Sequence, residues 1–159
     1  MTATLEKRHE AVRDEGGFTL IELAVVILII GILLAIAIPT FLGIRERAQN
    51  KTSQVALRNS LVAAKTAFSD EGTFNNVTLA SLQSIEPSLF IASGGISSAP
   101  QEVHYTISAG TYTAWSASLG GNCYGIQENG GTAGTFYASL KGAAVICDGS
   151  GFTWTGKWD

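Results

Sequence analysis

Hydrophobic positions are concentrated in one uninterrupted run near the start of the chain. From Leu23 to Ile38 no residue carries a polar side chain, and from Phe18 to Ile44 the one charged residue is Glu22. Written as a helix, residues 18–39 span about 32 Å, which matches the roughly 30 Å hydrocarbon core of a bilayer. The run therefore predicts one membrane-spanning helix.

After Pro39 the pattern changes to apolar residues spaced among polar ones. They recur at three- and four-residue intervals, which predicts an amphipathic helix with these residues on its buried face. The residues are Ile44, Ala48, Val55, Leu61, Val62 and Phe68. Asp70-Glu71-Gly72 supplies a glycine stop. A helix over 18–71 would be about 80 Å long, so we expect its second half to pack on a head and its first half to protrude.

The remaining chain predicts a small β-rich head. Residues 73–101 read as short elements, with a helical segment at 81–85 ahead of Pro87. Alternating apolar and polar residues then predict strands at 103–108, 112–118, 124–127, 135–139 and 152–158. A hairpin turn is expected at 128–131. We expect an antiparallel sheet of about four strands against one face of the long helix, an α+β fold.

No motif in the sequence supports catalysis. The 159 residues carry a formal net charge of −3, and 46% of them are hydrophobic, with the excess at the front. His9 and His104 are isolated histidines, and no Ser/His/Asp arrangement, phosphate loop or metal-ligand spacing can be argued. We therefore expect no catalytic residues, no metal site and no cofactor.

The two cysteines, Cys123 and Cys147, both fall in the head. Neither belongs to a CxxC motif or a histidine cluster, so they are poor metal ligands. A disulfide would close a loop of about 25 residues and contribute around 3.5 kcal/mol in the chain-entropy model. Free buried thiols are the alternative.

Glu22 is an unusual residue at the mouth of the apolar run. An acidic side chain inside a membrane helix costs roughly 3 kcal/mol at the centre and less near the end, although a carboxylate near a helix start complements the helix dipole. A carboxylate that snorkels or protonates at the interface is the alternative to a functional role. The run is also too long for an ordinary secretory signal, and the small pair Gly16-Gly17 precedes it.

The start of the run resembles the class III signal of type IV pilins and related pseudopilins. The resemblance rests on Gly17-Phe18-Thr19-Leu20-Ile21-Glu22-Leu23, with Gly31 and Pro39 beyond it, and covers roughly residues 10–70. In that family a prepilin peptidase cuts after the glycine and methylates the new amino terminus. The resemblance thus implies cleavage between Gly17 and Phe18, N-methylation of Phe18 and a leader that faces the cytoplasm.

The resemblance also implies roles for other residues of the helix. After cleavage Glu22 would lie four residues from the new amine, on the same helical face, and would pair with the amino terminus of a neighbouring subunit during assembly. Thr19 is a weaker assembly residue, because a threonine in a first turn can merely satisfy backbone groups. Gly31 and Pro39 would bracket a segment that loses helicity in the filament, although membrane helices commonly tolerate both residue types.

The resemblance and the pattern together give a division of the chain. We expect a cleaved leader at 1–17, a membrane and filament-core half at 18–44 and an amphipathic half at 45–71. A connecting region at 72–102 and a β-sheet head at 103–159 follow. The cysteine-closed loop near the carboxyl end resembles the D-region of pilins.

The function implied is that of a structural subunit. It would be held in the cytoplasmic membrane, then polymerise into an extracellular type IV pilus for adhesion, motility or DNA uptake. Implied partners are copies of itself, prepilin peptidase, a membrane assembly platform and minor pilins, with nucleic acid bound only by the assembled filament. A type II secretion pseudopilin is the alternative, although no acidic cluster suggests the calcium site such proteins often carry. A second alternative is a monomeric membrane-anchored binding module.

Overall fold

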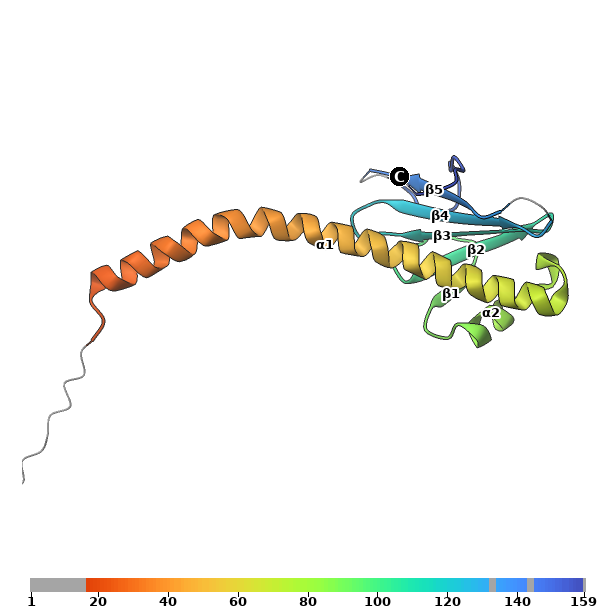
Figure 1. Cartoon of the computed structure of the whole chain (residues 1–159), viewed down its shortest axis with the longest axis horizontal. Helices are drawn as coiled ribbons and strands as arrows, with labels where there is room; N and C mark the ends of the chain where they lie inside the picture. The colour runs from red at the N-terminus through yellow and green to blue at the C-terminus, as the bar shows by residue number, and fades with distance from the viewer. Residues whose placement is uncertain (1–16, 132–133, 143–144, 159) are drawn as a thin grey trace, which may run out of the picture. The chain divides into compact units, whose positions relative to one another are not determined.

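The computed structural model describes residues 17–131, 134–142 and 145–158. Their elements run in the order α1 (Leu20–Glu71), a 3-10 turn η1 (Phe74–Asn76), α2 (Leu79–Ile85), β1 (Phe90–Ser93), β2 (Glu102–Ser108), β3 (Thr111–Ala117), β4 (Cys123–Asn129) and β5 (Phe136–Leu140) (Figure 1). The chain divides into two units after Thr40.

The first unit contains the apolar part of α1, and here the predicted helix is confirmed. α1 is long and apolar enough to cross a membrane, and every side chain from Phe18 to Thr40 is exposed. The helix continues through Gly31 and Pro39. Pro39 has no N–H to donate to the carbonyl of Ala35, while the hydroxyl of Thr40 donates to the carbonyl of Ile36 at 3.0 Å.

The second unit contains the rest of α1, which buries a face made mainly of small residues. The buried residues are Ser53, Gln54, Ala56, Leu57, Ser60, Leu61, Ala63, Ala64 and Ala67. The amphipathic helix is confirmed, but the predicted buried face is largely wrong, because Ile44, Val55 and Val62 are more than half exposed. Leu61 is buried and Phe68 is half-buried.

The physical reason lies in the sheet that covers this face. The main core cluster includes the buried tyrosines Tyr105, Tyr112 and Tyr124. These large rings fill the space between helix and sheet, so a close-packed interface leaves room for alanine and serine on the helix rather than for valine. A prediction from apolar spacing alone places the larger side chains on the buried face, and for this helix that prediction is largely wrong.

α1 ends as its sequence predicts. Gly72 has a positive φ of 71° and donates its N–H to the carbonyl of Phe68 at 2.8 Å, which is a glycine stop in the left-handed region. The short helix predicted at 81–85 is confirmed as α2, where Thr78 and Ser81 form a capping box.

The five strands of the described residues form one sheet in the order β1-β2-β3-β4-β5. β2 to β5 pair antiparallel, and they confirm four of the predicted strands to within a few residues. β1 pairs parallel with β2 and was not predicted. β4 runs through Asn129, so the turn after it begins later than the prediction at 128–131.

The strand predicted at 152–158 is wrong. Thr155 forms an isolated bridge with Tyr137 of β5, with two backbone hydrogen bonds of 2.8 Å. Phe152 packs against the small cluster around the disulfide, whereas Trp158 packs against the main core. Two aromatic anchors in different clusters hold this segment by side-chain packing, and the alternating pattern alone does not reveal that.

Polar contacts also fix the second half of α1 to the sheet, which lies along it in Figure 1. The hydroxyl of Ser53 donates to the carbonyl of Ala117 at 2.8 Å. Lys65 Nζ lies 3.1 Å from a carboxylate oxygen of Glu128 in β4. The head is thus one packed layer of helix on one sheet, as the α+β prediction states.

Candidate functional site

The start of α1 carries a reciprocal hydrogen-bonded cap. The backbone N–H and the hydroxyl of Thr19 donate to Oε2 of Glu22 at 2.8 and 2.7 Å, and the backbone N–H of Glu22 lies 3.3 Å from the Thr19 hydroxyl oxygen. This is a capping box, in which residues three apart satisfy the free N–H groups of the first turn. Thr19 therefore fixes the Glu22 carboxylate at the helix start.

The cap uses one oxygen of the carboxylate. Within the described residues no hydrogen bond reaches Oε1 of Glu22, and the side chain is exposed. A carboxylate with one oxygen anchored and one open is oriented toward a further donor at little cost in side-chain entropy. The sequence carries the signal for this cap, since Thr19 and Glu22 have the spacing of a T-x-x-E box, although from the sequence we predict only a weak assembly role for Thr19.

Gly17 and Phe18 precede the helix and lie in exposed, irregular backbone. The phenyl side chain of Phe18 is 87% exposed, and a Cβ on Gly17 would meet no atom within 4 Å. The peptide bond between them is therefore accessible to another protein. The remainder of the expected leader, residues 1–16, lies outside the described part of the chain, as does His9.

The helix after this cap presents a continuous apolar surface. The large hydrophobic residues between Phe18 and Ile44 are 48% to 87% exposed, far more apolar surface than a soluble monomer leaves uncovered. Near Gly31 a shallow depression of about 550 Å³ is lined by Ala24, Ile27, Leu28, Gly31, Ile32 and Ala35. This half of α1 requires a lipid or protein partner.

In the head, the predicted disulfide between Cys123 and Cys147 is confirmed. Both cysteines are buried with Trp115 and Ala117, and Val145 and Phe152 pack against them. A Cβ on Gly149 would lie 2.7 Å from the Trp115 ring, so the chain after Cys147 passes directly over that ring. The disulfide therefore attaches the C-terminal segment to the start of β4.

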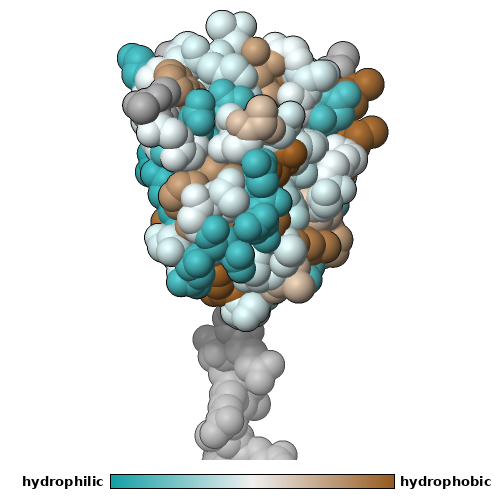
Figure 2. Space-filling model, turned by 90° about the vertical axis from the view of Figure 1, so that its right-hand side faces the viewer, coloured by the Kyte–Doolittle hydropathy of each residue, from teal (hydrophilic) through white to brown (hydrophobic). Residues whose placement is uncertain are grey.

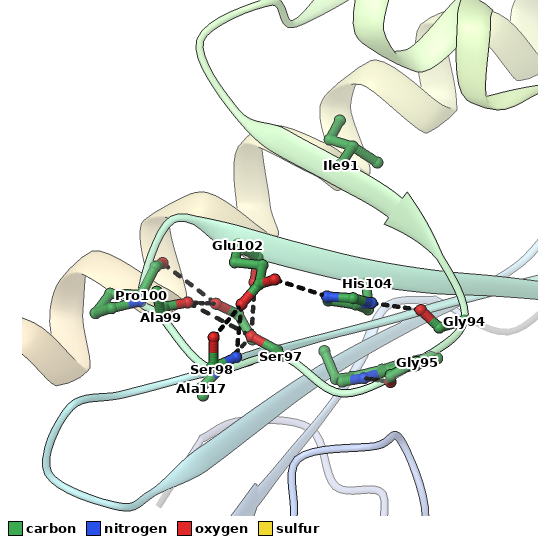
Figure 3. Close-up of polar contacts among 12 residues, drawn as sticks. Ile91, Gly94, Gly95, Ser97, Ser98, Ala99, Pro100, Glu102, His104 and Ala117 are labelled. Carbon is green, nitrogen blue, oxygen red and sulfur yellow. Dashed lines mark hydrogen bonds and ion pairs between the residues drawn. The ribbon is translucent and has the colours of Figure 1, made fainter.

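A polar network holds the loop between β1 and β2 beside this disulfide (Figure 3). The hydroxyl of Ser97 accepts the backbone N–H of Ala117 and donates to the carbonyl of Glu102, each at 2.8 Å. The backbone N–H of Ser97 donates to the carbonyl of Cys147 at 2.9 Å. The loop thus joins β2, β3 and the disulfide-bonded segment.

Glu102 and His104 complete this network. The backbone N–H of Ser98 donates to Glu102 at 2.6 Å, and chiefly this bond lowers the pKa of the Glu102 carboxyl below its usual value. His104 is buried, with Nδ1 against the carbonyl of Gly94 and Nε2 3.2 Å from Glu102. Nε2 lies close to the carboxylate without hydrogen-bond geometry.

The two ring nitrogens of His104 face the carbonyl of Gly94 and the carboxylate of Glu102, so the imidazole joins the loop after β1 to β2. Within the described residues no group of three or more His, Cys, Asp or Glu side chains could hold a metal ion.

The surface of the head differs from that of the apolar helix. Figure 2 faces the right-hand end of Figure 1, where the C-terminal end of α1 lies, and shows hydrophilic residues interspersed with isolated hydrophobic ones. Such a mixed surface is typical of a water-exposed domain. The apolar surface of α1 and its capped start are therefore the candidate assembly site.

Known proteins resemble this chain at its N-terminal helix and beyond it. A family model described as the prokaryotic N-terminal methylation motif matches residues 12–38. The type IV wide pilus major component PilA4 of Thermus thermophilus is 37% identical over 120 residues, which cover 76% of this chain and 79% of that protein.

Two other similarities are confined to shorter stretches. The type IV major pilin protein PilA of Myxococcus xanthus is 42% identical over 60 residues, 38% of this chain and 27% of that protein. The type II secretion system core protein G of Vibrio cholerae is 44% identical over 52 residues, 31% of this chain and 36% of that protein. No solved structure matches the chain with comparable strength.

Proposed function

The chain belongs to the type IV pilin family, and from that premise we propose that it is the main structural subunit of a type IV pilus. Members of this family are non-enzymatic structural proteins that reside in the membrane through the N-terminal helix and then in the pilus. The observation that carries the proposal is the hydrogen-bonded Thr19–Glu22 cap at the start of an exposed apolar helix.

We propose that prepilin peptidase cleaves between Gly17 and Phe18 and methylates the new amine. The position of this bond supports the proposal, because it precedes the first helical residue, Leu20, and is exposed. A protease needs extended backbone in its active site, so a bond inside α1 would have to be unwound before cleavage. The capping box begins at Thr19 and survives the removal of the leader.

Glu22 is proposed to control subunit register. The apolar surface around it must be covered in the filament, and covering a bare carboxylate with apolar groups costs several kcal/mol. A neighbouring subunit whose Phe18 amine reaches the open oxygen of Glu22 removes that cost, whereas a misplaced subunit leaves it. Correct register is thereby favoured over a general hydrophobic association.

Gly31 and Pro39 are proposed to weaken the helix between them. Glycine costs about 1 kcal/mol relative to alanine in a helix, and proline about 3 kcal/mol. The backbone from Gly31 to Pro39 is helical in the isolated chain, so any loss of helicity belongs to the filament. Proposed further partners are the membrane assembly platform and minor pilins.

A pilin is favoured over a type II secretion pseudopilin by the extent of similarity. The Thermus pilus component aligns with 76% of the chain, head included, whereas the Vibrio secretion protein aligns with 31%. The roles in adhesion, motility or DNA uptake belong to the assembled filament and are proposed on the same family grounds.

The test of this function is Glu22→Ala in the native host. We expect a processed, membrane-inserted protein whose yield in sheared surface filaments falls about a hundredfold, because an uncompensated buried amine costs about 3 kcal/mol or more. Mass spectrometry should show methylated Phe18 at the terminus of both proteins. Glu46→Ala, which removes an exposed carboxylate from the same helix outside the apolar half, is the matched control. A normal filament yield for Glu22→Ala would contradict the register role.

A further inference from the structure

A hollow of about 330 Å³ lies between α1 and the C-terminal segment. It is lined by Lys51, Gln54, Arg58, Tyr137, Lys157 and Trp158, together with Gly156. Three of these side chains are cations, although the mature chain from Phe18 carries more acidic residues than basic ones. A concave surface lined by three cations in an otherwise acidic chain attracts negative groups.

Two of the cations are held in place before any ligand arrives. The Arg58 guanidinium carbon lies 5.1 Å from the centre of the Trp158 ring, and the Trp158 indole N–H donates to the carbonyl of Gly125 at 2.9 Å. Lys51 Nζ donates to the Gln54 side chain at 3.1 Å. Side chains fixed in this way lose little entropy when they bind, so the hollow is preorganised.

The described residues do not neutralise these cations. Their two salt bridges join Lys65 to Glu128 and His104 to Glu102. Asp70 and Glu71 form an adjacent, exposed acidic pair at the end of α1 that is likewise outside those salt bridges. The chain therefore presents a basic hollow and an acidic pair whose charges are opposite in sign.

The two features lie on different flanks of the helix. Arg58 and Asp70 are twelve residues apart, which corresponds to a rotation of about 120° and a rise of about 18 Å along α1. They cannot meet within one chain, but a second copy displaced along α1 can bring its acidic pair to the hollow. A contact between two different surfaces of identical subunits is heterologous and builds open-ended filaments.

We propose that the hollow lined by Lys51, Arg58 and Lys157 receives the carboxylates of Asp70 and Glu71 from a neighbouring copy of this chain. This contact rests on the proposed function, since it requires a filament. It adds a polar contact between heads to the apolar contact between helices, and it sets the displacement of neighbouring heads at about 18 Å along α1.

The test is zero-length carbodiimide crosslinking of intact filaments, which joins a lysine amine to a carboxylate in direct contact. We expect a covalent dimer in which Lys51 or Lys157 is linked to Asp70 or Glu71. The double variant Lys51→Arg/Lys157→Arg keeps both charges but removes both amines, so its filaments should form and lose the dimer. Lys141→Arg changes an exposed lysine outside the hollow and should keep it.

A charge exchange gives an independent measurement. Arg58→Glu and Asp70→Lys should each lower filament yield about tenfold, as expected when like charges meet at an interface, and the double variant should recover most of it. Links confined to one chain, dimers joined at other residues, or no recovery in the double variant would overturn the proposal. If the wild-type chain enters no filament at all, the pilin function fails and this contact fails with it.

Discussion

Residues 20–44 and 45–71 belong to one continuous helix, α1, yet the two parts differ in which side chains are exposed and which are buried. In the first part every large aliphatic residue is exposed, while in the second the buried face consists of alanines, serines, two leucines and Gln54. The comparison teaches that the two parts have different partners. The second is matched to the sheet of its own chain, whereas the first is matched to lipid or to other copies.

The largest effect on stability is expected when leucine is changed to alanine in each of the two parts. Leu57→Ala removes a fully buried side chain and should lower the free energy of unfolding of the head by about 2–5 kcal/mol. Leu34→Ala removes a half-exposed one and should change it by less than about 0.5 kcal/mol. Urea unfolding of the full chain in detergent, followed by tryptophan fluorescence, measures both. Equal losses would break the comparison.

Removal of the disulfide is expected to give the next largest loss of stability. It tests whether the head is stabilised by contacts within its own chain. Cys123→Ala/Cys147→Ala opens a loop of sequence separation 24 and should cost about 3.5 kcal/mol of head stability in the chain-entropy model. Reduction of the wild-type chain is the matched control and should lower the urea midpoint by a similar amount. An unchanged midpoint would show that side-chain packing alone holds the C-terminal segment.

The Thr19–Glu22 cap should act on the first part of α1 alone. Thr19→Ala removes the two hydrogen bonds that the hydroxyl makes with Glu22, keeps the one from the backbone N–H, and should weaken the first helical turn by about 1 kcal/mol, while Thr19→Ser keeps all three. Faster hydrogen exchange at residues 20–23 in micelles, with the urea midpoint of the head unchanged, is the expected result. A shifted head midpoint would show that the two parts are coupled.

The smallest effect concerns Glu102 and is confined to acid pH. Its lowered pKa means that the folded state binds a proton less readily than the unfolded chain, so the carboxylate stabilises the head above its usual pKa, near 4.5. That stability is lost as the pH falls through the folded-state pKa. Thermal melts of Glu102→Gln should start below wild type at about pH 7 and converge with it as the pH falls below the lowered pKa of Glu102. A difference in melting temperature that stays constant with pH would contradict this role of the Glu102 carboxylate.

Local signals made most elements predictable from the sequence. The unbroken apolar run, the Gly72 stop and the alternating strands each depend on neighbours within a few residues, and each was found close to its expected position. The strand β1 and the segment 152–158 were missed or wrong because their state depends on β2 and on two separate aromatic clusters. The Thr19–Glu22 cap was visible in the sequence but its geometry was not.

The sequence by itself determined the family, the cleavage motif, the length of the apolar helix and the place of Glu22, because these features are linear and short-ranged. The tertiary structure decided which face of 45–71 is buried, since only the tyrosines of the sheet select alanine over valine at that interface. It also decided how the C-terminal segment folds back to bring Lys157 beside Lys51 and Arg58. That proximity joins residues about a hundred positions apart, and no periodic pattern records so long a contact.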